Sequence, residues 1–131
     1  MKEAQLMAAR IVIDVMEGKN LNKVFQKYSE ENKINPKDIS QVKDLIFGTL
    51  RSYGKTKFVI NKLVKRMPSN TLILSLLHVA LFQLIFNRSN SYTVVDQAVS
   101  ASNMINKRHT KFINGVLRTF LREKESILEK A

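Results

Sequence analysis

Cationic side chains are the residues of this chain whose type and spacing could do chemistry. Lys107, Arg108 and Lys111 fall in a polar turn and at the start of an expected last helix, where unpaired backbone N–H groups also favour anions. Arg118 and Arg122 follow Lys111 by seven and eleven residues, so the three share nearly one helix face. Because Arg can hold a phosphate through two parallel hydrogen bonds, this pattern predicts phosphate contact along that face.

Other polar residues near this face have plainer roles. Arg118 could instead extend over the core or pair with Glu125 or Asp96. Asp96 is the one acid in residues 51–122, and we expect it to pair with a cation rather than to act as a general base. His109 could hydrogen-bond phosphate only weakly.

A second group of cations lies near the middle of the chain. Its members are Arg51, Lys55, Lys57, Lys62, Lys65 and Arg66. We expect Lys62, Lys65 and Arg66 to share a helix face, since they are three and four residues apart. Tyr53 could stack on a nucleobase, although a partly buried packing role is the expected one. Arg51 either contacts a ligand or braces a neighbouring helix.

The positive charge is concentrated in one stretch. Residues 51–122 hold twelve Lys and Arg and one acid, whereas residues 1–50 hold eight cations and seven acids. The net charge of the chain is +11. Self-repulsion of this kind disfavours the compact state unless a polyanion offsets it. Nucleic acid is the usual polyanion, because neutralised phosphates release counterions; the alternative is a merely basic, well-solvated surface.

Several kinds of chemistry lack the residues they need. The chain has no Cys and two His, which excludes a disulfide framework, a Cys-based zinc site and a thiol nucleophile. It contains no Gly-rich phosphate loop and no G-x-S-x-G or H-E-x-x-H motif. We expect His78, in the most apolar segment, to be a hydrogen-bonded core residue. We therefore expect the chain to bind no metal and no cofactor and to have no catalytic activity of its own.

Length and hydropathy predict the organisation of the chain. Its 131 residues suit one domain, expected to span residues 1–131 with its core at about residues 4–123. The richest apolar run, residues 72–86, is shorter than the ~18–20 residues of a spanning helix. The first apolar stretch is interrupted by Arg10 and Asp14, so no secretory signal is expected. These features predict a cytoplasmic protein without membrane contact.

Apolar residues recur at helical spacing along nearly the whole chain, and no stretch alternates with period two. We therefore predict an all-α fold, a single-domain bundle of about seven helices. The expected helices cover about residues 2–17, 20–28, 36–54, 58–66, 72–86, 93–105 and 111–128, with a polar loop near residues 30–37. Asn35 before Pro36 is a strong helix start, Ser69 or Asn70 should cap the fifth helix, and Gly54 should kink or end the third. The fifth helix, apolar on nearly every face, belongs at the centre of the bundle.

Four segments carry a resemblance to a known family. They are Phe47-Gly48-Thr49-Leu50-Arg51, Ile60-Asn61-Lys62-Leu63, Leu81-Phe82-Gln83-Leu84 and Phe112-Ile113-Asn114-Gly115-Val116-Leu117-Arg118. In this order they resemble the NusB-like RNA-binding domain over about residues 4–123. The chain is more similar to the version that forms the N-terminal part of rRNA 5-cytosine methyltransferases of the RsmB (Sun, Fmu) type than to the antitermination factor NusB itself.

The resemblance implies a helical bundle that binds ribosomal RNA, with small-subunit rRNA as the expected target. It implies a non-catalytic role, because the methyltransferase domain, its S-adenosylmethionine loop and its catalytic cysteines have no counterpart in these residues. A ribosomal protein, or a separate or missing methyltransferase domain, is a further expected partner. Charge and resemblance together predict RNA contacts at Arg51, Lys55, Lys107, Arg108, Lys111, Arg118 and Arg122.

The chain departs from the family pattern at two places. Its first helix has only Lys2 and Arg10 as cations, where the antitermination factor has an Arg-rich N-terminus, which argues against transferring that RNA site. Ser89-Asn90-Ser91-Tyr92 stands where a Pro-x-His-Ala-like entry to the sixth helix is expected, so family contacts there are not carried over.

The motif residues Gly48, Asn114 and Gly115 have a structural interpretation. The two glycines would let the third and last helices cross closely, and Asn114 would hydrogen-bond across that crossing. Arg51 and Arg118 are then the motif residues expected to contact RNA.

The sequence is also compatible with other functions. The chain could be a NusB-type transcription antitermination factor or a helical protein-interaction module, with an apolar stripe on the acid-balanced first two helices and cations that steer an acidic partner. Duplex DNA binding is less favoured, because no helix pair combines a short Gly turn with a basic recognition helix.

Overall fold

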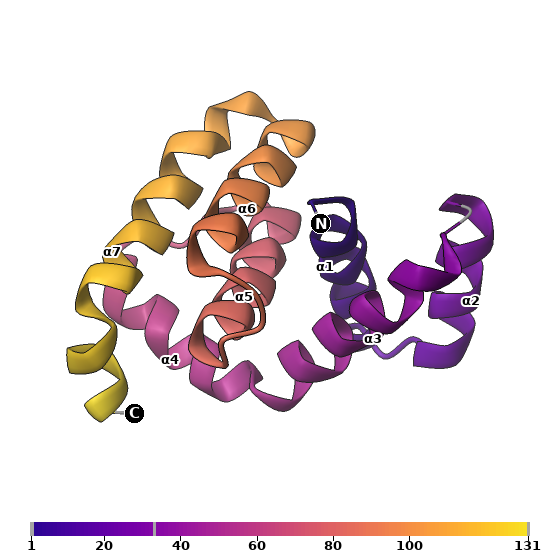
Figure 1. Cartoon of the computed structure of the whole chain (residues 1–131), viewed down its shortest axis with the longest axis horizontal. Coiled ribbons are helices and arrows are strands. Elements are labelled where there is room, and N and C mark those ends of the chain that lie inside the picture. Colours follow the sequence, from indigo (N-terminus) through magenta and orange to yellow (C-terminus); the bar gives the residue numbers. More distant parts are fainter. Residues whose placement is uncertain (1, 33, 131) are drawn as a thin grey trace.

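A computed structural model describes residues 2–32 and 34–130 of the chain. Within these ranges the chain forms seven α-helices and one short 3-10 helix, η1. Their bounds are α1 Lys2–Met16, α2 Leu21–Asn32, α3 Pro36–Arg51, α4 Tyr53–Leu63, α5 Thr71–Ile85, α6 Ser91–Ile105, η1 Lys107–His109 and α7 Thr110–Glu129. Figure 1 shows α5 inside the bundle, with α6 and α7 toward one side and α1, α3 and α2 toward the other. The predicted all-α bundle of seven helices is confirmed.

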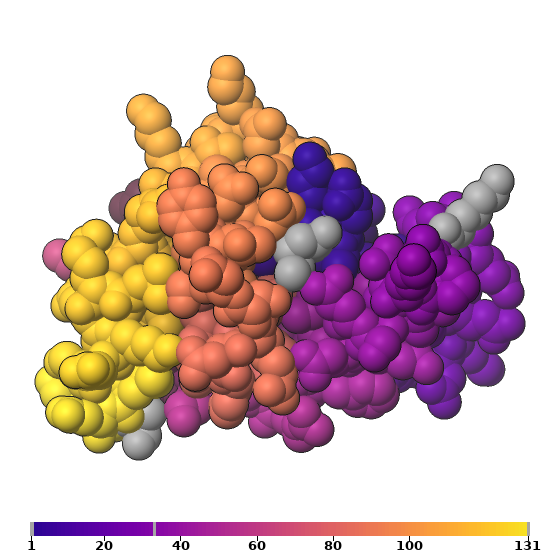
Figure 2. All heavy atoms as spheres, viewed as in Figure 1, coloured from indigo at the N-terminus to yellow at the C-terminus, as the bar shows by residue number. Residues whose placement is uncertain are grey.

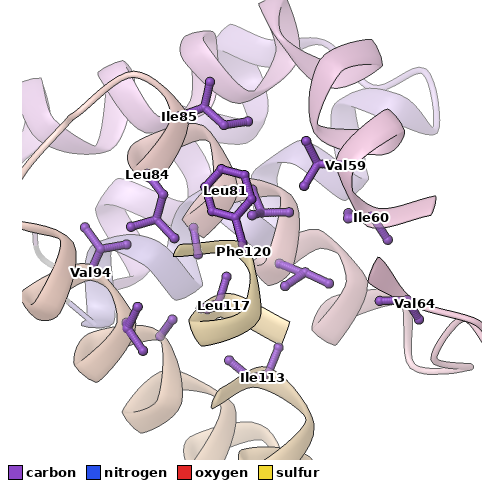
Figure 3. Close-up of a cluster of buried hydrophobic side chains, with 14 of the residues drawn as sticks. Val59, Ile60, Val64, Leu81, Leu84, Ile85, Val94, Ile113, Leu117 and Phe120 are labelled. Carbon is purple, nitrogen blue, oxygen red and sulfur yellow. The ribbon is translucent and has the colours of Figure 1, made fainter. Parts of the chain in front are cut away.

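The helix α5 lies at the centre, as its apolar sequence predicts. Every residue from Ser75 to Ile85 is buried, and α5 contributes to both hydrophobic cores of the molecule. One core packs α5 against α4, α6 and α7; Figure 3 shows Leu117 and Phe120 of α7 in this core together with Leu81 of α5. The other core packs α5 against α1 and α3, with α2 contributing Val24. The positions of all the outer helices therefore depend on α5.

Buried polar contacts fix α1 against its neighbours. Gln5 Nε2 donates to Gln83 Oε1 at 2.9 Å and to the Val94 carbonyl at 3.3 Å, which joins α1 to α5 and α6. Ser75 Oγ donates to the Ala9 carbonyl at 2.8 Å. Because a buried polar group without a partner is costly, these pairs favour one register of α1 on α5.

Asparagine side chains begin five of the helical segments. Asn20, Asn35, Asn70, Asn90 and Asn106 each accept a hydrogen bond from a backbone N–H in the turn that follows. The predicted caps of the third and fifth helices are confirmed at Asn35 and Asn70. An Asn cap satisfies backbone donors that a helix start leaves free, and the cap of Asn90 starts α6 at Ser91, slightly earlier than expected.

Three helix boundaries differ from the prediction. The second helix continues into the expected polar loop and ends at Asn32. The third ends at Arg51, and Gly54 lies inside α4 rather than ending α3, because Ser52 has the irregular backbone between them. The fourth ends at Leu63, since Val64 is extended and its side chain is buried in the core.

The expected crossing of the third and last helices at two glycines is wrong. Gly48 of α3 instead packs against the Phe82 ring of α5, which a Cβ at this position would overlap. Gly115 of α7 is exposed, and a Cβ there would meet no heavy atom within 4 Å. Asn114 Oδ1 accepts a hydrogen bond from Arg118 Nε of its own helix at 2.8 Å. Gly48 therefore allows close packing of α3 on α5, and the other two residues belong to the surface.

The expected core role of His78 agrees with its surroundings. The residue is 2% exposed, its Nδ1 lies 2.6 Å from Thr56 Oγ1, and its ring stacks on Tyr53 with centroids 4.0 Å apart. These contacts join α5 to the first turn of α4. Burial lowers the pKa of His78 to about 4, and the positive charge of Lys57 adds to the shift. The imidazole is therefore neutral near pH 7.

The pKa of His78 predicts how stability changes with pH. Its ordinary value is about 6.5, so the unfolded chain takes up a proton there before the folded chain does. Above pH 6.5 the free energy of unfolding is unaffected by this group. As the pH falls from 6.5 toward 4, the free energy of unfolding decreases by about 3 kcal/mol in all. Urea unfolding across this range should show the loss, and His78→Asn should remove it from the pH profile. Parallel profiles of the wild type and the variant would contradict the assignment.

Candidate nucleic-acid interface

The turn before α7 presents cations to solvent. Asn106 caps η1 by accepting from the Arg108 N–H at 3.0 Å, and Thr110 Oγ1 donates to the Lys107 carbonyl at 2.9 Å. These bonds order the backbone, while the side chains of Lys107, Arg108 and Lys111 remain exposed. Figure 2 shows long side chains projecting from the connection between α6 and α7. The sequence correctly placed this basic group in a short turn and at a helix start.

His109 does not share this exposure. Its Nε2 is buried and has no hydrogen-bond partner within residues 2–32 and 34–130. The expectation that His109 could hydrogen-bond a phosphate is therefore not supported at this nitrogen.

The outer face of α7 continues the basic surface. Lys111, Gly115, Arg118 and Arg122 are all exposed, as their spacing predicts. Arg122 Nη2 donates to Thr119 Oγ1 at 3.0 Å. We call the exposed set Lys107, Arg108, Lys111, Arg118 and Arg122 the basic strip. No acid occurs in the sequence between its first and last members.

Arg118 is held in place without being neutralised. Besides its 2.8 Å bond to Asn114, its guanidinium lies over the Tyr92 ring, 5.8 Å from the centroid. Within the described ranges it forms no salt bridge with Glu125 or Asp96, so the ion-pair alternative is not supported. The guanidinium is thus positioned by an amide and an aromatic ring, and its charge stays available.

A groove lies beside the strip, between α7 and the segment that follows α4. It has a volume of about 360 Å³, and the residues of α7 that line it include Phe112, Gly115 and Val116. Its cations are Lys65, Arg66 and Lys111, and no acid lines it.

Since α4 ends at Leu63, the expectation of a shared helix face for the second cation cluster is wrong. Tertiary packing brings Lys65 and Arg66 to α7 instead.

The remaining two predicted contacts lie elsewhere. Arg51 and Lys55 are exposed at the junction of α3 and α4, where Lys55 Nζ lies 5.6 Å from the Phe86 ring centroid. We call these two residues the junction patch. In Figure 1 this junction and the connection between α6 and α7 are at opposite ends of the bundle. The seven predicted residues therefore form two separate surfaces rather than one.

Tyr92 is a surface residue that the sequence did not single out for binding. It is 68% exposed, in the first turn of α6, and its backbone N–H is held by the Asn90 cap at 2.9 Å. The departure from the family pattern at residues 89–92 indicated that the start of α6 differs from the start of the corresponding helix in the family. The exposure of the ring and its contact with Arg118 required the three-dimensional arrangement.

A second groove lies on the acid-balanced side of the molecule. It has a volume of about 440 Å³ between α1, the end of α2 and the start of α3, and it also reaches Met104 of α6. Its wall combines Met7 and Tyr28 with charged residues of both signs, among them Glu3, Arg10 and Asp38. Burial raises the pKa of Tyr28, with the negative charge of Asp14 as the next cause. Figure 2 shows the surface hollowed between α1 and the α2–α3 end.

Residues 2–32 and 34–130 contain neither a cluster of metal ligands nor a membrane-spanning helix. No group of three or more His, Cys, Asp or Glu residues is placed to hold a metal ion. None of the helices combines the length and the apolar character needed to cross a bilayer.

The fold and the surface together define a class of protein: a helical bundle whose last helix presents a basic outer face. The chain belongs to the NusB family, whose sequence profile matches residues 2–122.

Relatives and a solved structure agree with this assignment. The chain is 32% identical over 128 residues to ribosomal RNA small subunit methyltransferase B of Pasteurella multocida (strain Pm70), a match covering 95% of this chain and 28% of that protein. It is also 32% identical over 126 residues to the methyltransferase B of Escherichia coli O139:H28, covering 93% and 29%. The chain thus spans less than a third of the length of these relatives.

The fold is similar to that in a crystal structure of the antitermination factors NusB and NusE in complex with dsRNA. The TM-score is 0.78 at 23% identity, covering 92% of this chain and 95% of that one.

Proposed function

We propose that this chain is a non-catalytic RNA-binding domain that binds ribosomal RNA of the small subunit. The observation that carries the proposal is the basic strip: five exposed cations in an acid-free stretch at η1 and on the outer face of α7. Such a surface binds phosphates by charge and counterion release. We accordingly propose a cytoplasmic location.

The named relatives support this choice of ligand. Two of them are methyltransferases of small-subunit rRNA, and the solved NusB structure contains dsRNA. The chain matches only 28–29% of each methyltransferase, and it has no Cys for nucleophilic attack. We therefore assign it RNA docking rather than methyl transfer, in company with a methyltransferase domain.

Within this proposal the basic strip is the main contact surface and the junction patch a second one. Arg118 contributes an oriented guanidinium, because Asn114 and Tyr92 fix it. Tyr92 itself offers an exposed ring on which an unpaired base can stack. The strip supplies most of the affinity through phosphates, and Tyr92 adds a contact that depends on an unpaired base.

Removing charge from the strip should weaken RNA binding. Arg108→Ala with Lys111→Ala should lower the affinity for a small-subunit rRNA fragment and reduce the slope of log K against log salt by about 0.7–0.9 for each lost phosphate contact. The melting temperature should not change, because both side chains are exposed. Fluorescence anisotropy at several salt concentrations measures both quantities.

The control removes the same charge from the other side of the molecule. Lys23 and Lys27 are exposed on α2, and replacing both by Ala should leave the affinity close to that of the wild type. The strip is not the contact surface if its variant binds as well as the wild type, or if the two double variants lose affinity equally.

Tyr92→Ala should act in a different way. One lost stacking contact is worth about 1–3 kcal/mol, roughly a 5- to 150-fold weaker Kd for RNA with unpaired bases. The salt slope should stay unchanged, since Asn114 still holds Arg118 and no phosphate contact is lost. Tyr92→Phe should retain the affinity. A Tyr92→Ala variant that binds like the wild type would exclude the stacking contact.

A second candidate function, protein docking, is favoured by the groove between α1, α2 and α3. Its mixture of Met, Tyr and charges of both signs suits a polypeptide better than a polyanion, and the structurally similar NusB was solved with NusE. Met104 is 54% exposed at its rim. If this function applies, a ribosomal protein that co-purifies after nuclease treatment should be lost with Met104→Asp; retention of the partner would exclude the groove.

A further inference from the structure

The position of Gly115 is not explained by the packing of the bundle. It lies within α7, one turn after Lys111, and a Cβ there would meet nothing within 4 Å. Glycine in a helix interior is less stable than Ala by about 1 kcal/mol. At Gly48 the Phe82 ring explains why a side chain is excluded, whereas at Gly115 no part of the described chain does so.

The surroundings of Gly115 indicate what approaches it. Lys111 and Arg118 are exposed one turn to either side along α7. Lys65 and Arg66, from the segment after α4, line the same groove as Gly115. The bare backbone of Gly115 thus lines a shallow groove that also holds cations, and a bound chain can approach α7 more closely here than at a residue with a side chain.

We propose that this groove binds the phosphate–ribose backbone of RNA, with Gly115 as the point of closest approach and Lys65 and Arg66 as phosphate contacts. The inference rests on the proposed function and extends it, because these three residues lie outside the basic strip. A sugar–phosphate chain fits the requirements: it carries repeated negative charge, and it needs close access to backbone. The apolar side chains of Phe112 and Val116, which line the groove, would lie against the ribose.

The test exploits opposite effects of one methyl group. Gly115→Ala should raise the melting temperature by up to about 4 °C, because helix propensity improves without a clash. The same variant should weaken binding to the small-subunit rRNA fragment, by about tenfold, and Gly115→Leu should weaken it further. A glycine with a purely structural role would not separate stability from affinity in this direction.

Gly54 provides the matched control. It too is exposed in a helix, and a Cβ there would meet nothing within 4 Å. Gly54→Ala should raise the melting temperature in the same way but lower RNA affinity less than Gly115→Ala does, because Gly54 adjoins only the second contact surface, the junction patch. Lys65→Ala with Arg66→Ala should reduce the salt slope by about 0.7 for each lost phosphate contact, without a change in melting temperature.

The outcomes separate the two proposals. If the wild-type chain binds no rRNA fragment in preference to duplex DNA, the proposed function is overturned and this inference with it. If the wild type binds rRNA but Gly115→Ala and Gly115→Leu keep its affinity, the groove is not part of the interface and only this inference fails. Higher stability with lower affinity supports it.

Discussion

Burial of α5 is the constraint on which the rest of the structure depends. A helix that is apolar on nearly every face is stable only when other helices cover it on all sides, and α5 lies in both cores. That requirement places Gly48 against Phe82 and pairs Gln5 with Gln83. It also positions α7, whose Leu117 and Phe120 are buried in the core with α5 while Lys111 and Arg118 remain outside. The basic strip is therefore presented by a rigid element.

The helices and helix caps that the sequence predicts correctly have local physical causes. Helical periodicity follows from burying one stripe of each helix, and the caps at Asn35 and Asn70 follow from the donors that every helix start leaves free. The roles of Gly48 and Gly115 depend on what lies across space from each of them, and the sequence predicts both roles wrongly. Lys65 and Arg66 left the expected helix because Val64 turns into the core. The cations were recognised by type, but their division into two surfaces, and the exposure of Tyr92, follow from tertiary packing.

The basic half of the chain keeps its charge. In the parts of the chain that the structure describes, Arg88 with Asp44 is the one salt bridge that involves a cation of residues 51–122. Lys55, Lys62 and Arg118 instead lie over the rings of Phe86, Phe58 and Tyr92. An aromatic ring orders a cation while cancelling none of its formal charge. The fold thus tolerates a self-repulsion that a polyanion would relieve.

Under the proposed function, the separation of the strip from the junction patch has a consequence for selectivity. Two contact regions at opposite ends of a rigid bundle can be occupied together only by a ligand whose charged groups span the molecule. Once one end is bound, the second contact forms at a high effective concentration, provided that the connecting ligand has the right reach. A short oligonucleotide gains nothing from this arrangement, whereas a folded RNA of matching dimensions gains avidity. The bundle can therefore discriminate among RNAs by their size and shape even where it recognises no base.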